Sequence, residues 1–364
     1  MKIVDNISAK QLIINLSILL SKPTGIGNYA QNLFPYLKPF QPTLLVAQKY
    51  SDFDCYSIPS DLTPDHGTKG HLNRLIWTQF QLPKIYKKLK SSLLFSPLPE
   101  APLYTDCRFV VTSFDMIPLR FAKGFSPLIA YHRYYTPQVF KQAQHIICIS
   151  QTTAKDITDF YQIPASKITA IPLAHDRTHF LPLNLPTSNY FLYIGRQDPY
   201  KNIQRLISAF AALPNCKDYE LWLVGPIDSR YTPTLEAQVA ELGITNQVKF
   251  LNYVPYSELP KIINQAIALV FPSLWEGFGL PVLEAMACGT PVITSNLSSL
   301  PEVAGDAAIL IDPYNTGEIT EAMQAVATNS ELRSRLSSQG ITHSQQFSWE
   351  KTGKATAEVL SRYL

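Results

Sequence analysis

Short apolar runs, rich in β-branched and aromatic residues, recur along the chain and are separated by amphipathic stretches. Such runs predict buried strands, and the stretches between them have the spacing of helices. The predicted strands lie within residues 43–48, 109–115, 145–150, 167–173, 190–195, 220–225, 248–254, 267–273 and 291–295. Strands that alternate with helices indicate parallel sheets, and these strands fall into two sets. We therefore predict an α/β protein with two sheets.

Three segments outside these strands carry further information. Residues 181–190, between the two sets, contain two prolines, two asparagines and a serine and are the best candidate for a linker. Residues 347–364 have helical spacing, with Ser348 as a plausible N-cap, and predict a terminal helix. Residues 12–20 are an apolar run of only nine residues, too short to span a bilayer and not followed by a small-residue cleavage site. We expect a buried first strand and its continuation there, not a signal peptide.

Composition narrows the class of protein. A chain of 364 residues, 46% of them hydrophobic, is long enough for roughly two domains. Residues 1–175 hold 18 Lys and Arg against 10 Asp and Glu, a net +8, whereas residues 176–364 hold 13 against 18, a net −5. This asymmetry suggests that the first half meets an anionic group or a membrane surface, but it is too diffuse to indicate nucleic-acid binding. The five cysteines are scattered without a C-x-x-C pair, which favours a reduced, cytoplasmic chain.

Each half contains a Gly-x-Gly sequence, at Gly25 and Gly27 and at Gly277 and Gly279. Glycine lets backbone N–H groups approach a phosphate at the N-terminus of a helix, where the partial positive charge favours an anion. The first sequence also fits a dinucleotide fingerprint, because Ala30 follows and an aspartate comes 22 residues later. That fingerprint needs its glycine directly after a strand, and residues 21–24 intervene. A dehydrogenase is therefore the less favoured interpretation.

The second glycine loop is bracketed by two carboxylates, Glu276 and Glu284. Pro281 suits the first position of a helix and Gly289 suits its termination, so a helix of about eight residues is predicted between them. The amino end of this helix then points into the loop. Both glutamates could be solvated surface charges, but this explanation leaves the surrounding apolar residues unaccounted for.

Two cations follow the predicted strand at 190–195. Arg196 and Lys201 lie just past its carboxyl end, where open α/β sheets bind ligands. Arginine offers a planar fork for two phosphate oxygens and lysine a compact charge, so together they could neutralise a diphosphate.

These residues carry a resemblance to a known family. The stretches GRQDPYKN, FPSLWEGFGLPVLEAMACGTPVITSNLSSLPEVAGDAAILIDPYN and FSWEKT resemble the retaining glycosyltransferases of family 4, and the match covers most of residues 190–364. Its most specific element is the E-x7-E spacing from Glu276 to Glu284. The N-terminal half resembles the family more loosely, through GIGNYAQNL, RLIWTQFQLP, VVTSFDMIPLRF and CISQTTAKDI.

The resemblance implies the two-domain GT-B fold, with two Rossmann-like domains facing each other across a cleft. Its expected domains are an acceptor-side domain, 1–180, a nucleotide-sugar domain, 187–346, and a C-terminal helix, 347–364, that packs back on the first domain. It also implies roles for particular residues. Glu276 would hold sugar hydroxyls and Glu284 ribose hydroxyls, while Arg196 and Lys201 would contact the pyrophosphate. The remaining expected donor contacts are the backbone of Gly277, Phe278, Gly279 and Leu280, the phosphate loop at Gly25 and Gly27, and Val254 near the base.

Two positions depart from the family pattern. Relatives commonly have His-Asp after the VVT strand, with the histidine reaching the donor sugar, whereas this chain has Phe114 and Asp115. Either the pocket accepts a sugar with a less polar face, or the site has lost activity and only binds. Residues 172–176, PLAHD, replace the usual Pro-Asn-Gly-Val-Asp and leave the hinge geometry open.

No metal or other cofactor is expected, because fixed cations would take the place of Mg²⁺. The D-x-D sequence at Asp52 and Asp54 is explained by chance and is expected to be a solvated loop. Residues 82–95 place Lys84, Lys87, Lys88 and Lys90 beside apolar residues, which predicts an amphipathic surface helix. The alternative is that this stretch contacts an anionic membrane. The protein would then be cytoplasmic and associated with the cytoplasmic face of the membrane.

Three functions remain after this reasoning. The leading hypothesis is a retaining hexosyltransferase of a surface polysaccharide pathway, using a nucleotide-diphosphate sugar and a saccharide or lipid-linked acceptor. GDP-mannose is the favoured donor and a UDP-sugar is open. The second hypothesis, motivated by Phe114, is a catalytically impaired nucleotide-sugar-binding subunit of a glycosyltransferase complex. The third, a GT-B isomerase or glycogen-type enzyme, is disfavoured by the continuous E-x7-E block.

Overall fold

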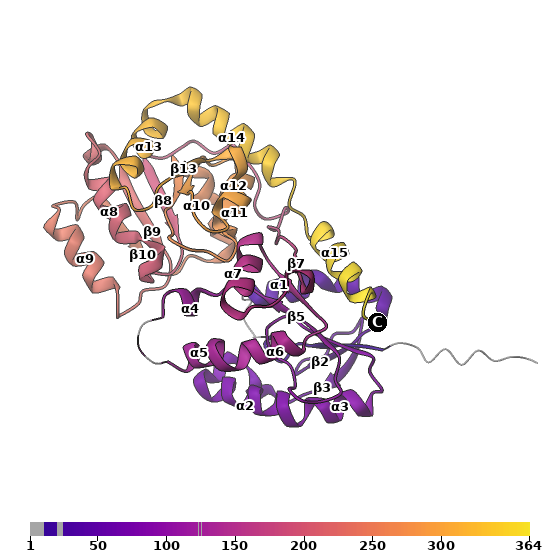
Figure 1. Ribbon diagram of the computed structural model, residues 1–364. Coiled ribbons are helices and arrows are strands. Elements are labelled where there is room, and N and C mark those ends of the chain that lie inside the picture. Colours follow the sequence, from indigo (N-terminus) through magenta and orange to yellow (C-terminus); the bar gives the residue numbers. More distant parts are fainter. Residues whose placement is uncertain (1–10, 20–24, 123, 125) are drawn as a thin grey trace, which may run out of the picture. The chain divides into compact units, whose positions relative to one another are not determined.

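The structure, a computed structural model, describes residues 11–19, 25–122, 124 and 126–364. These residues form two compact units (Figure 1). The N-terminal unit comprises the chain up to Pro172 together with Trp349–Leu364, and the C-terminal unit comprises Leu173–Ser348.

Within the described residues, the N-terminal unit is built on a seven-stranded sheet in the order β3-β2-β1-β4-β5-β6-β7. Every neighbouring pair is parallel. The strands are β1 (Leu12–Asn15), β2 (Thr43–Val46), β3 (Asp54–Ser57), β4 (Leu93–Ser96), β5 (Phe109–Ser113), β6 (His145–Cys148) and β7 (Ile168–Ala170). All residues of β1, β2, β4, β5 and β6 are buried, as expected when helices cover both faces of a parallel sheet.

Helices connect these strands, and one returns from the far end of the chain. They are α1 (Gly25–Leu37), α2 (Gly67–Phe80), α3 (Leu82–Lys88), α4 (Ile117–Arg120), α5 (Pro127–Ala130), α6 (Thr136–Gln142), α7 (Gln151–Tyr161) and α15 (Trp349–Ser361). The C-terminal helix α15 packs against α1, where Gly353 leaves room for the ring of Tyr36. The Thr352 hydroxyl also donates to the Pro172 carbonyl at 2.7 Å, so α15 is fixed to the N-terminal unit at both its face and its first turn.

The C-terminal unit repeats this architecture with a six-stranded parallel sheet in the order β10-β9-β8-β11-β12-β13 among the residues described. Its strands are β8 (Tyr190–Ile194), β9 (Glu220–Val224), β10 (Val248–Leu251), β11 (Ala268–Phe271), β12 (Val292–Ser295) and β13 (Ile309–Ile311). Its helices are α8 (Ile203–Ala211), α9 (Thr232–Glu241), α10 (Leu259–Gln265), α11 (Leu280–Ala287), α12 (Leu300–Ala304), α13 (Thr316–Thr328) and α14 (Ser330–Ser344). The order reverses between β8 and β11, which in open α/β sheets opens a crevice at the carboxyl ends of the strands.

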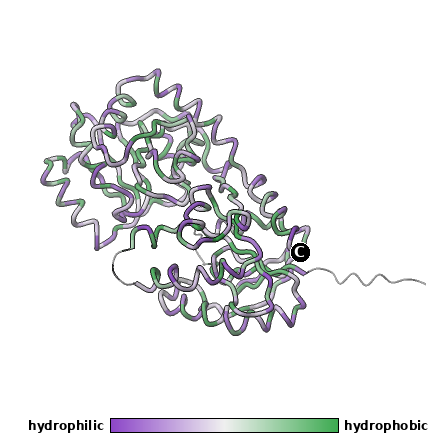
Figure 2. Tube along the Cα trace, viewed as in Figure 1, coloured by the Kyte–Doolittle hydropathy of each residue, from purple (hydrophilic) through white to green (hydrophobic). Residues whose placement is uncertain are grey.

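The predicted α/β class with two parallel sheets is confirmed, and every predicted strand is present. In Figure 2 the trace mixes apolar and polar residues along the helices of both units, as amphipathic helices that cover a sheet require. The apolar run near the start forms β1 and its buried continuation through Ile18. Of the expected linker, 181–190, residues 181–189 form no helix or strand and Tyr190 begins β8. The segment belongs to the C-terminal unit, where Asn264 bonds the backbone of Leu181 and Leu183.

Two expectations about local structure were wrong. Gly25 and Gly27 lie in the first turn of α1 and not in a loop, because tertiary packing of the helix overrides the low helical propensity of glycine. The basic stretch 82–95 is helical only to Lys88, and from Leu93 it forms the fully buried strand β4. Its apolar residues therefore serve two different elements.

Candidate active site in the C-terminal unit

The turn between β8 and α8 presents the two cations predicted from the sequence. β8 ends at Ile194, and a 3₁₀ turn, Pro199–Lys201, leads into α8. Asn202 adopts a left-handed conformation, and its amide donates to the carbonyls of Pro272, at 3.1 Å, and Pro313, at 2.6 Å. This residue ties the turn to the ends of β11 and β13, so Lys201 is carried on backbone that is fixed from two sides.

Lys201 and Glu276 meet at the carboxyl ends of β8 and β11. The lysine Nζ lies 2.6 Å from the glutamate Oε1, and their side chains are only 12% and 11% exposed. The same ammonium lies 5.3 Å from the ring centroids of Tyr200 and Phe271, which shield it from water. Two residues separated by 75 positions are thus brought together as a partly buried pair of opposite charges.

The loop that carries Glu276 is held by two serines that follow β12. Ser298 accepts a hydrogen bond from the Glu276 N–H at 3.1 Å. The fully buried Ser299 donates to the carbonyls of Glu276 and Phe278, at 3.0 and 2.7 Å. Since these bonds fix the backbone on both sides of Gly277, the orientation of the loop does not depend on a ligand.

α11 begins directly at this loop. Gly279 precedes its first residue with φ of 118°, a conformation that disfavours any side chain, and a Cβ there would lie 2.8 Å from Leu300 Cδ2. Pro281 lies in the first turn, and Gly289, with φ of 76°, follows the last. The predicted helix and both of its sequence signals are therefore observed. Its amino end, with N–H groups that have no partner within the helix, faces the loop of Gly277–Leu280.

Glu284 lies in the second turn of α11 and is half-buried. Burial raises the pKa of its carboxyl to about 8. No hydrogen-bond donor to this carboxyl occurs among the described residues of the chain. Its charge contributes to the raised pKa of Tyr256, whose principal cause is burial, and this residue follows the loop after β10. Glu284 is therefore a carboxylate with unused hydrogen-bonding capacity beside a partly exposed aromatic residue.

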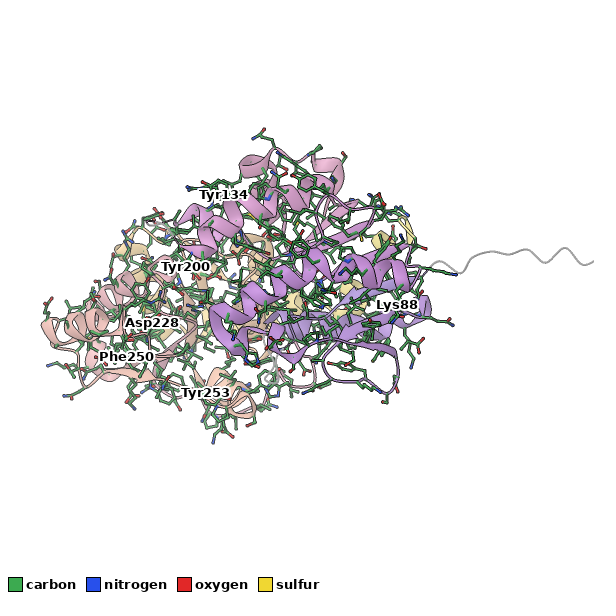
Figure 3. All side chains as sticks on the ribbon, turned by 90° about the horizontal axis from the view of Figure 1, so that it is seen from below. Lys88, Tyr134, Tyr200, Asp228, Phe250 and Tyr253 are labelled. Atoms are coloured by element: carbon green, nitrogen blue, oxygen red, sulfur yellow. The ribbon has the colours of Figure 1, made fainter. Side chains whose placement is uncertain are left out.

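The other residues predicted to bind the donor take no part in the Lys201–Glu276 contact. Arg196 is 63% exposed and pairs with Asp198, 3.0 Å away, and not with Glu276. Val254 is half-buried in the loop after β10, next to the strongly exposed Tyr253. Figure 3 labels Tyr253, together with Tyr200 of the loop after β8 and Asp228 of the loop after β9. Gly25 and Gly27 belong to the N-terminal unit, and the residues directly before Gly25 lie outside the described part of the chain.

The two departures from the family pattern have local structural roles. Phe114 packs edge-to-face on Tyr29, with ring centroids 5.3 Å apart, and Tyr29 is hydrogen-bonded to Thr112 at 3.1 Å. His175 is buried, its Nδ1 has no partner among the described residues, and burial lowers its pKa to about 4. A phenyl group cannot replace the hydrogen bond of the expected histidine. In residues 172–176, the buried Ala174 stands where the family pattern has glycine, and the buried neutral imidazole of His175 stands where it has valine.

Sequence reasoning missed the groups that position the loop. Ser298, Ser299 and Asn202 are polar residues in common turn sequences, and no spacing links them to Glu276. Ser273, in the same loop, is fully buried and its hydroxyl has no partner in the described structure. The described residues contain no group of three or more His, Cys, Asp or Glu side chains arranged to hold a metal ion. Nor does any helix among them combine the length and apolar character needed to cross a membrane.

The paired α/β units and the loop at the amino end of α11 define a protein of the two-domain GT-B fold. A family model described as "Glycosyl transferases group 1" matches residues 176–343, and one described as "Glycosyltransferase Family 4" matches residues 23–179. Together they cover most of both units, and the chain belongs to the glycosyltransferase families that they describe.

Curated relatives point in the same direction. O-antigen chain mannosyltransferase B of Escherichia coli is 33% identical over 235 residues, which are 61% of this chain and 60% of that protein. O-antigen chain mannosyltransferase RfbU of Salmonella typhimurium is 27% identical over 315 residues, 83% of this chain and 87% of that protein. The chain thus spans under two thirds of the first relative and most of the second.

Solved structures share the fold at low sequence identity. Sucrose-phosphate synthase from Thermosynechococcus elongatus superimposes with a TM-score of 0.76 at 19% identity, covering 97% of this chain and 98% of that chain. Anabaena HepE, solved with UDP and glucose, gives a TM-score of 0.74 at 17% identity over 97% of this chain and 100% of that chain. At sequence identities this low, the comparison shows a shared fold and does not identify the substrate.

Proposed function

We propose that this protein is a retaining hexosyltransferase that moves a sugar from a nucleotide-diphosphate donor to a saccharide or lipid-linked acceptor. The observation that carries the proposal is the Lys201–Glu276 pair, which lies at the carboxyl ends of β8 and β11 and at the amino end of α11. A cation, a carboxylate and a helix N-terminus are the three groups that a sugar joined to a diphosphate requires.

The chemistry divides between these groups. Breaking the anomeric C–O bond leaves negative charge on the nucleoside diphosphate and positive character on the sugar ring. Lys201 would transfer its interaction from Glu276 to the diphosphate, and the amino end of α11 would add its partial positive charge. Glu276, released from the lysine, would accept hydrogen bonds from sugar hydroxyls. The exposed Arg196 would exchange Asp198 for a phosphate oxygen.

Glu284 is proposed to bind the ribose. Its carboxyl has no donor in the described structure, and two neighbouring ribose hydroxyls would supply two. Val254 is proposed to lie near the base and the backbone of Gly277–Leu280 near the sugar and phosphate. Gly25 and Gly27 are proposed to approach the phosphates from the N-terminal unit.

GDP-mannose is the proposed donor, and a UDP-sugar is the alternative. Support comes from the names of the relatives, which are mannosyltransferases of O-antigen chains. Those names also support a place for this protein in surface polysaccharide synthesis, acting in the cytoplasm. No metal is proposed for the reaction, because Lys201, Arg196 and the helix terminus already offer positive charge to the diphosphate.

The test is release of free nucleoside diphosphate from a panel of UDP-, GDP- and ADP-sugars, with EDTA present and with or without short mannose oligosaccharides. Turnover of GDP-mannose alone is the expected result, and proton NMR of the product should show the anomeric configuration of the donor retained. Inversion would refute the retaining mechanism. Activity that returns only on adding Mg²⁺ would refute metal independence.

A nucleotide-sugar-binding subunit without activity is the second candidate, and Phe114 favours it. Its ring is engaged with Tyr29 and offers no hydrogen bond to a sugar. Phe114→His distinguishes the two: a gain of turnover from none would support the binding subunit, whereas an already active wild-type protein would exclude it.

Membrane contact is proposed for the basic residues of 82–95. Lys84, Lys87, Lys88 and Lys90 are all exposed on or just after α3. Liposome sedimentation with vesicles of phosphatidylcholine, with and without phosphatidylglycerol, tests it against a variant with all four lysines changed to glutamine. Equal sedimentation of the two proteins would remove this contact from the proposal.

A further inference from the structure

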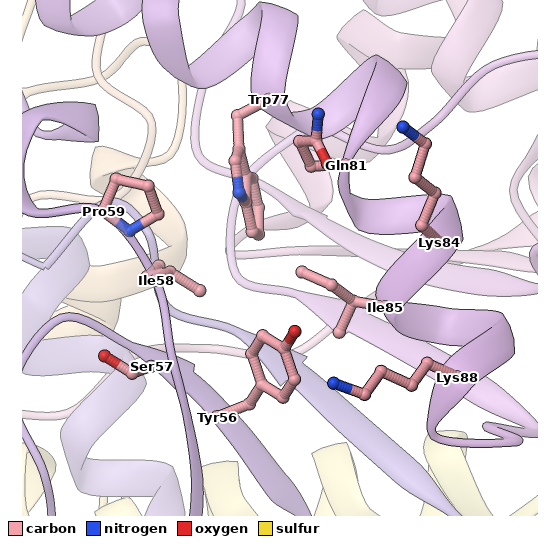
Figure 4. Close-up of a pocket in the computed structure, with 9 residues that line it drawn as sticks. All are labelled: Tyr56, Ser57, Ile58, Pro59, Trp77, Gln81, Lys84, Ile85 and Lys88. Carbon is pink, nitrogen blue, oxygen red and sulfur yellow. The ribbon is translucent and has the colours of Figure 1, made fainter.

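A pocket of about 350 Å³ lies in the N-terminal unit between the edge strand β3 and the helices α2 and α3 (Figure 4). It is lined by Tyr56, Ser57, Ile58, Pro59, Trp77, Gln81, Lys84, Ile85 and Lys88. None of these residues belongs to the proposed donor site, which consists of turns of the C-terminal unit together with Gly25 and Gly27. The pocket therefore needs an explanation of its own.

Aromatic and aliphatic side chains form its inner surface. Trp77 and Ile85 come from the helices and are buried in the core of the unit, whereas Tyr56 comes from β3 and is half-buried. Figure 4 shows the indole of Trp77 and the ring of Tyr56 on opposite sides of the opening. Flat aromatic surfaces of this kind suit the C–H faces of a sugar ring, and the volume lies in the range of small-molecule sites.

Two lysines one helical turn apart line the same pocket. Lys84 and Lys88 have the i, i+4 spacing that places both on one face of α3. The Lys88 Nζ lies 5.3 Å from the Tyr56 ring centroid, which places the ammonium of this exposed lysine beside the aromatic wall of the pocket. No carboxylate lies within ion-pair distance of either lysine in the part of the chain that the structure describes. The Gln81 amide and the Ser57 hydroxyl add polar groups.

From this combination we infer that the pocket is a second ligand site, which takes a sugar-sized polar group bearing a phosphate or a carboxylate. The aromatic walls receive the ring, and Lys84 and Lys88 neutralise the anion as two point charges. Such a group occurs on a free acidic sugar or sugar phosphate, and on the headgroup of an anionic glycerophospholipid. The inference goes beyond the proposed transfer reaction and does not require that reaction to occur.

Two charge-matched variants isolate the pocket. Lys84→Gln with Lys88→Gln removes both lining cations, whereas Lys87→Gln with Lys90→Gln removes two cations from the same stretch that do not line the pocket. All four lysines are exposed, so both variants should fold, which circular dichroism would verify. The probes are mannose 1-phosphate and glucuronate, with mannose as the neutral control, and phosphatidylcholine vesicles with and without phosphatidylglycerol. Ligand-observed NMR measures the sugars and sedimentation measures the vesicles.

The expected result is binding of at least one anionic probe that weakens about tenfold in the Lys84–Lys88 variant. In the Lys87–Lys90 variant, binding of the soluble probes should stay unchanged and binding of anionic vesicles should fall by much less, because these two lysines would add only to the general membrane contact. Loss confined to the Lys84–Lys88 variant with the soluble probes identifies a free acidic sugar as the source. The same pattern with anionic vesicles alone identifies a lipid headgroup. Equal losses of binding in both variants would mean that only diffuse positive charge attracts the probes, and would refute the proposed site. Binding of neutral mannose as strong as that of the anionic probes would also refute it, and so would the absence of binding to any probe. The donor assay on the same variants reports separately on the proposed transfer activity.

Discussion

Among the residues that the structure describes, each unit contains one ion pair with both side chains largely removed from water, and the two pairs are built differently. In the N-terminal unit, Arg74 and Glu100 meet through two hydrogen bonds of 2.7 and 2.8 Å, with side chains 2% and 3% exposed. The arginine also donates to the Leu62 carbonyl and contacts His71. In the C-terminal unit, Lys201 and Glu276 share a single contact and keep some exposure.

The difference separates a structural pair from one that can exchange partners. A planar guanidinium bound at both ends has no remaining direction for a ligand, and its network links α2 to the segment after β4. An ammonium with one carboxylate partner, at the carboxyl ends of strands and beside a helix N-terminus, retains donors for another anion. Burial of an ion pair alone therefore does not identify a functional site. The two pairs differ in the number of hydrogen-bond donors that the cation leaves free for a ligand.

The largest expected effect tests the structural pair. Arg74→Leu leaves Glu100 buried and unpaired, and we expect the free energy of unfolding to fall by about 3–5 kcal/mol in urea titrations. The exposed Lys69→Leu, on the same helix, should change it by less than about 0.5 kcal/mol. Because Arg74 is not among the residues proposed to bind the donor, turnover per folded molecule should stay at the wild-type level. A variant that keeps its stability but loses turnover would reverse our assignment of the two pairs.

The second prediction concerns the exchangeable pair. Glu276→Gln keeps the size of the side chain and removes its charge, and we expect kcat for the donor to fall by about 10²–10³ because the group acts on the developing charge of the transition state. The melting temperature should change far less than in Arg74→Leu. Glu331→Gln, an exposed carboxylate in the same unit, provides the control. Wild-type turnover in the Glu276 variant would sink the role given to this residue.

A smaller effect, on stability, is expected at Gly279, which follows the loop that carries Glu276. Gly279→Ala places a Cβ in a conformation that disfavours it and 2.8 Å from Leu300, so we expect a cost of about 1–3 kcal/mol, measured as unfolding in urea. At Gly317, an exposed position with negative φ near the start of α13, an added Cβ would lie 3.2 Å from the flexible Asn315 side chain, so Gly317→Ala should change stability by less than about 1 kcal/mol. If both variants behaved alike, the loop would be more adaptable than its hydrogen bonds to Ser299 indicate.

Most of the strands and the ligand loop were predicted from the sequence for the same physical reason. The strands β3, β4 and β13 were not predicted, and the apolar residues of β4 were assigned to an amphipathic helix. Fully buried strands need continuous apolar runs, and the helix after Gly279 needs a proline and a glycine at its ends, so both leave local signals. The strand β3 was missed because its residues, Asp54–Ser57, are exposed or half-buried at a sheet edge and show no apolar run. The contacts of Ser298 and Ser299 with the loop of Glu276 were missed because they join segments about 20 residues apart without a periodic pattern.

An effect that depends on pH is expected from Glu284, the carboxylate of this site that has no cationic partner among the described residues. Its native pKa of about 8 lies above its ordinary value near 4.5, so between these pH values the native state binds more protons than the unfolded state. Stability should therefore fall as pH rises through this window. In Glu284→Gln that contribution disappears, and the difference between the two unfolding curves isolates it from the other titrating groups.

Donor binding should show the opposite sign. If ribose hydroxyls donate to Glu284, the carboxyl must be ionised in the complex, and the affinity for the nucleoside diphosphate should rise by up to about tenfold per pH unit below pH 8. Calorimetry in two buffers of different ionisation enthalpy would detect the released proton. Glu284→Gln should bind more weakly and without this dependence. A wild-type affinity that falls with rising pH would mean that the protonated carboxyl is the donor, and Glu284 would then hold an acceptor atom of the ligand and not its hydroxyls.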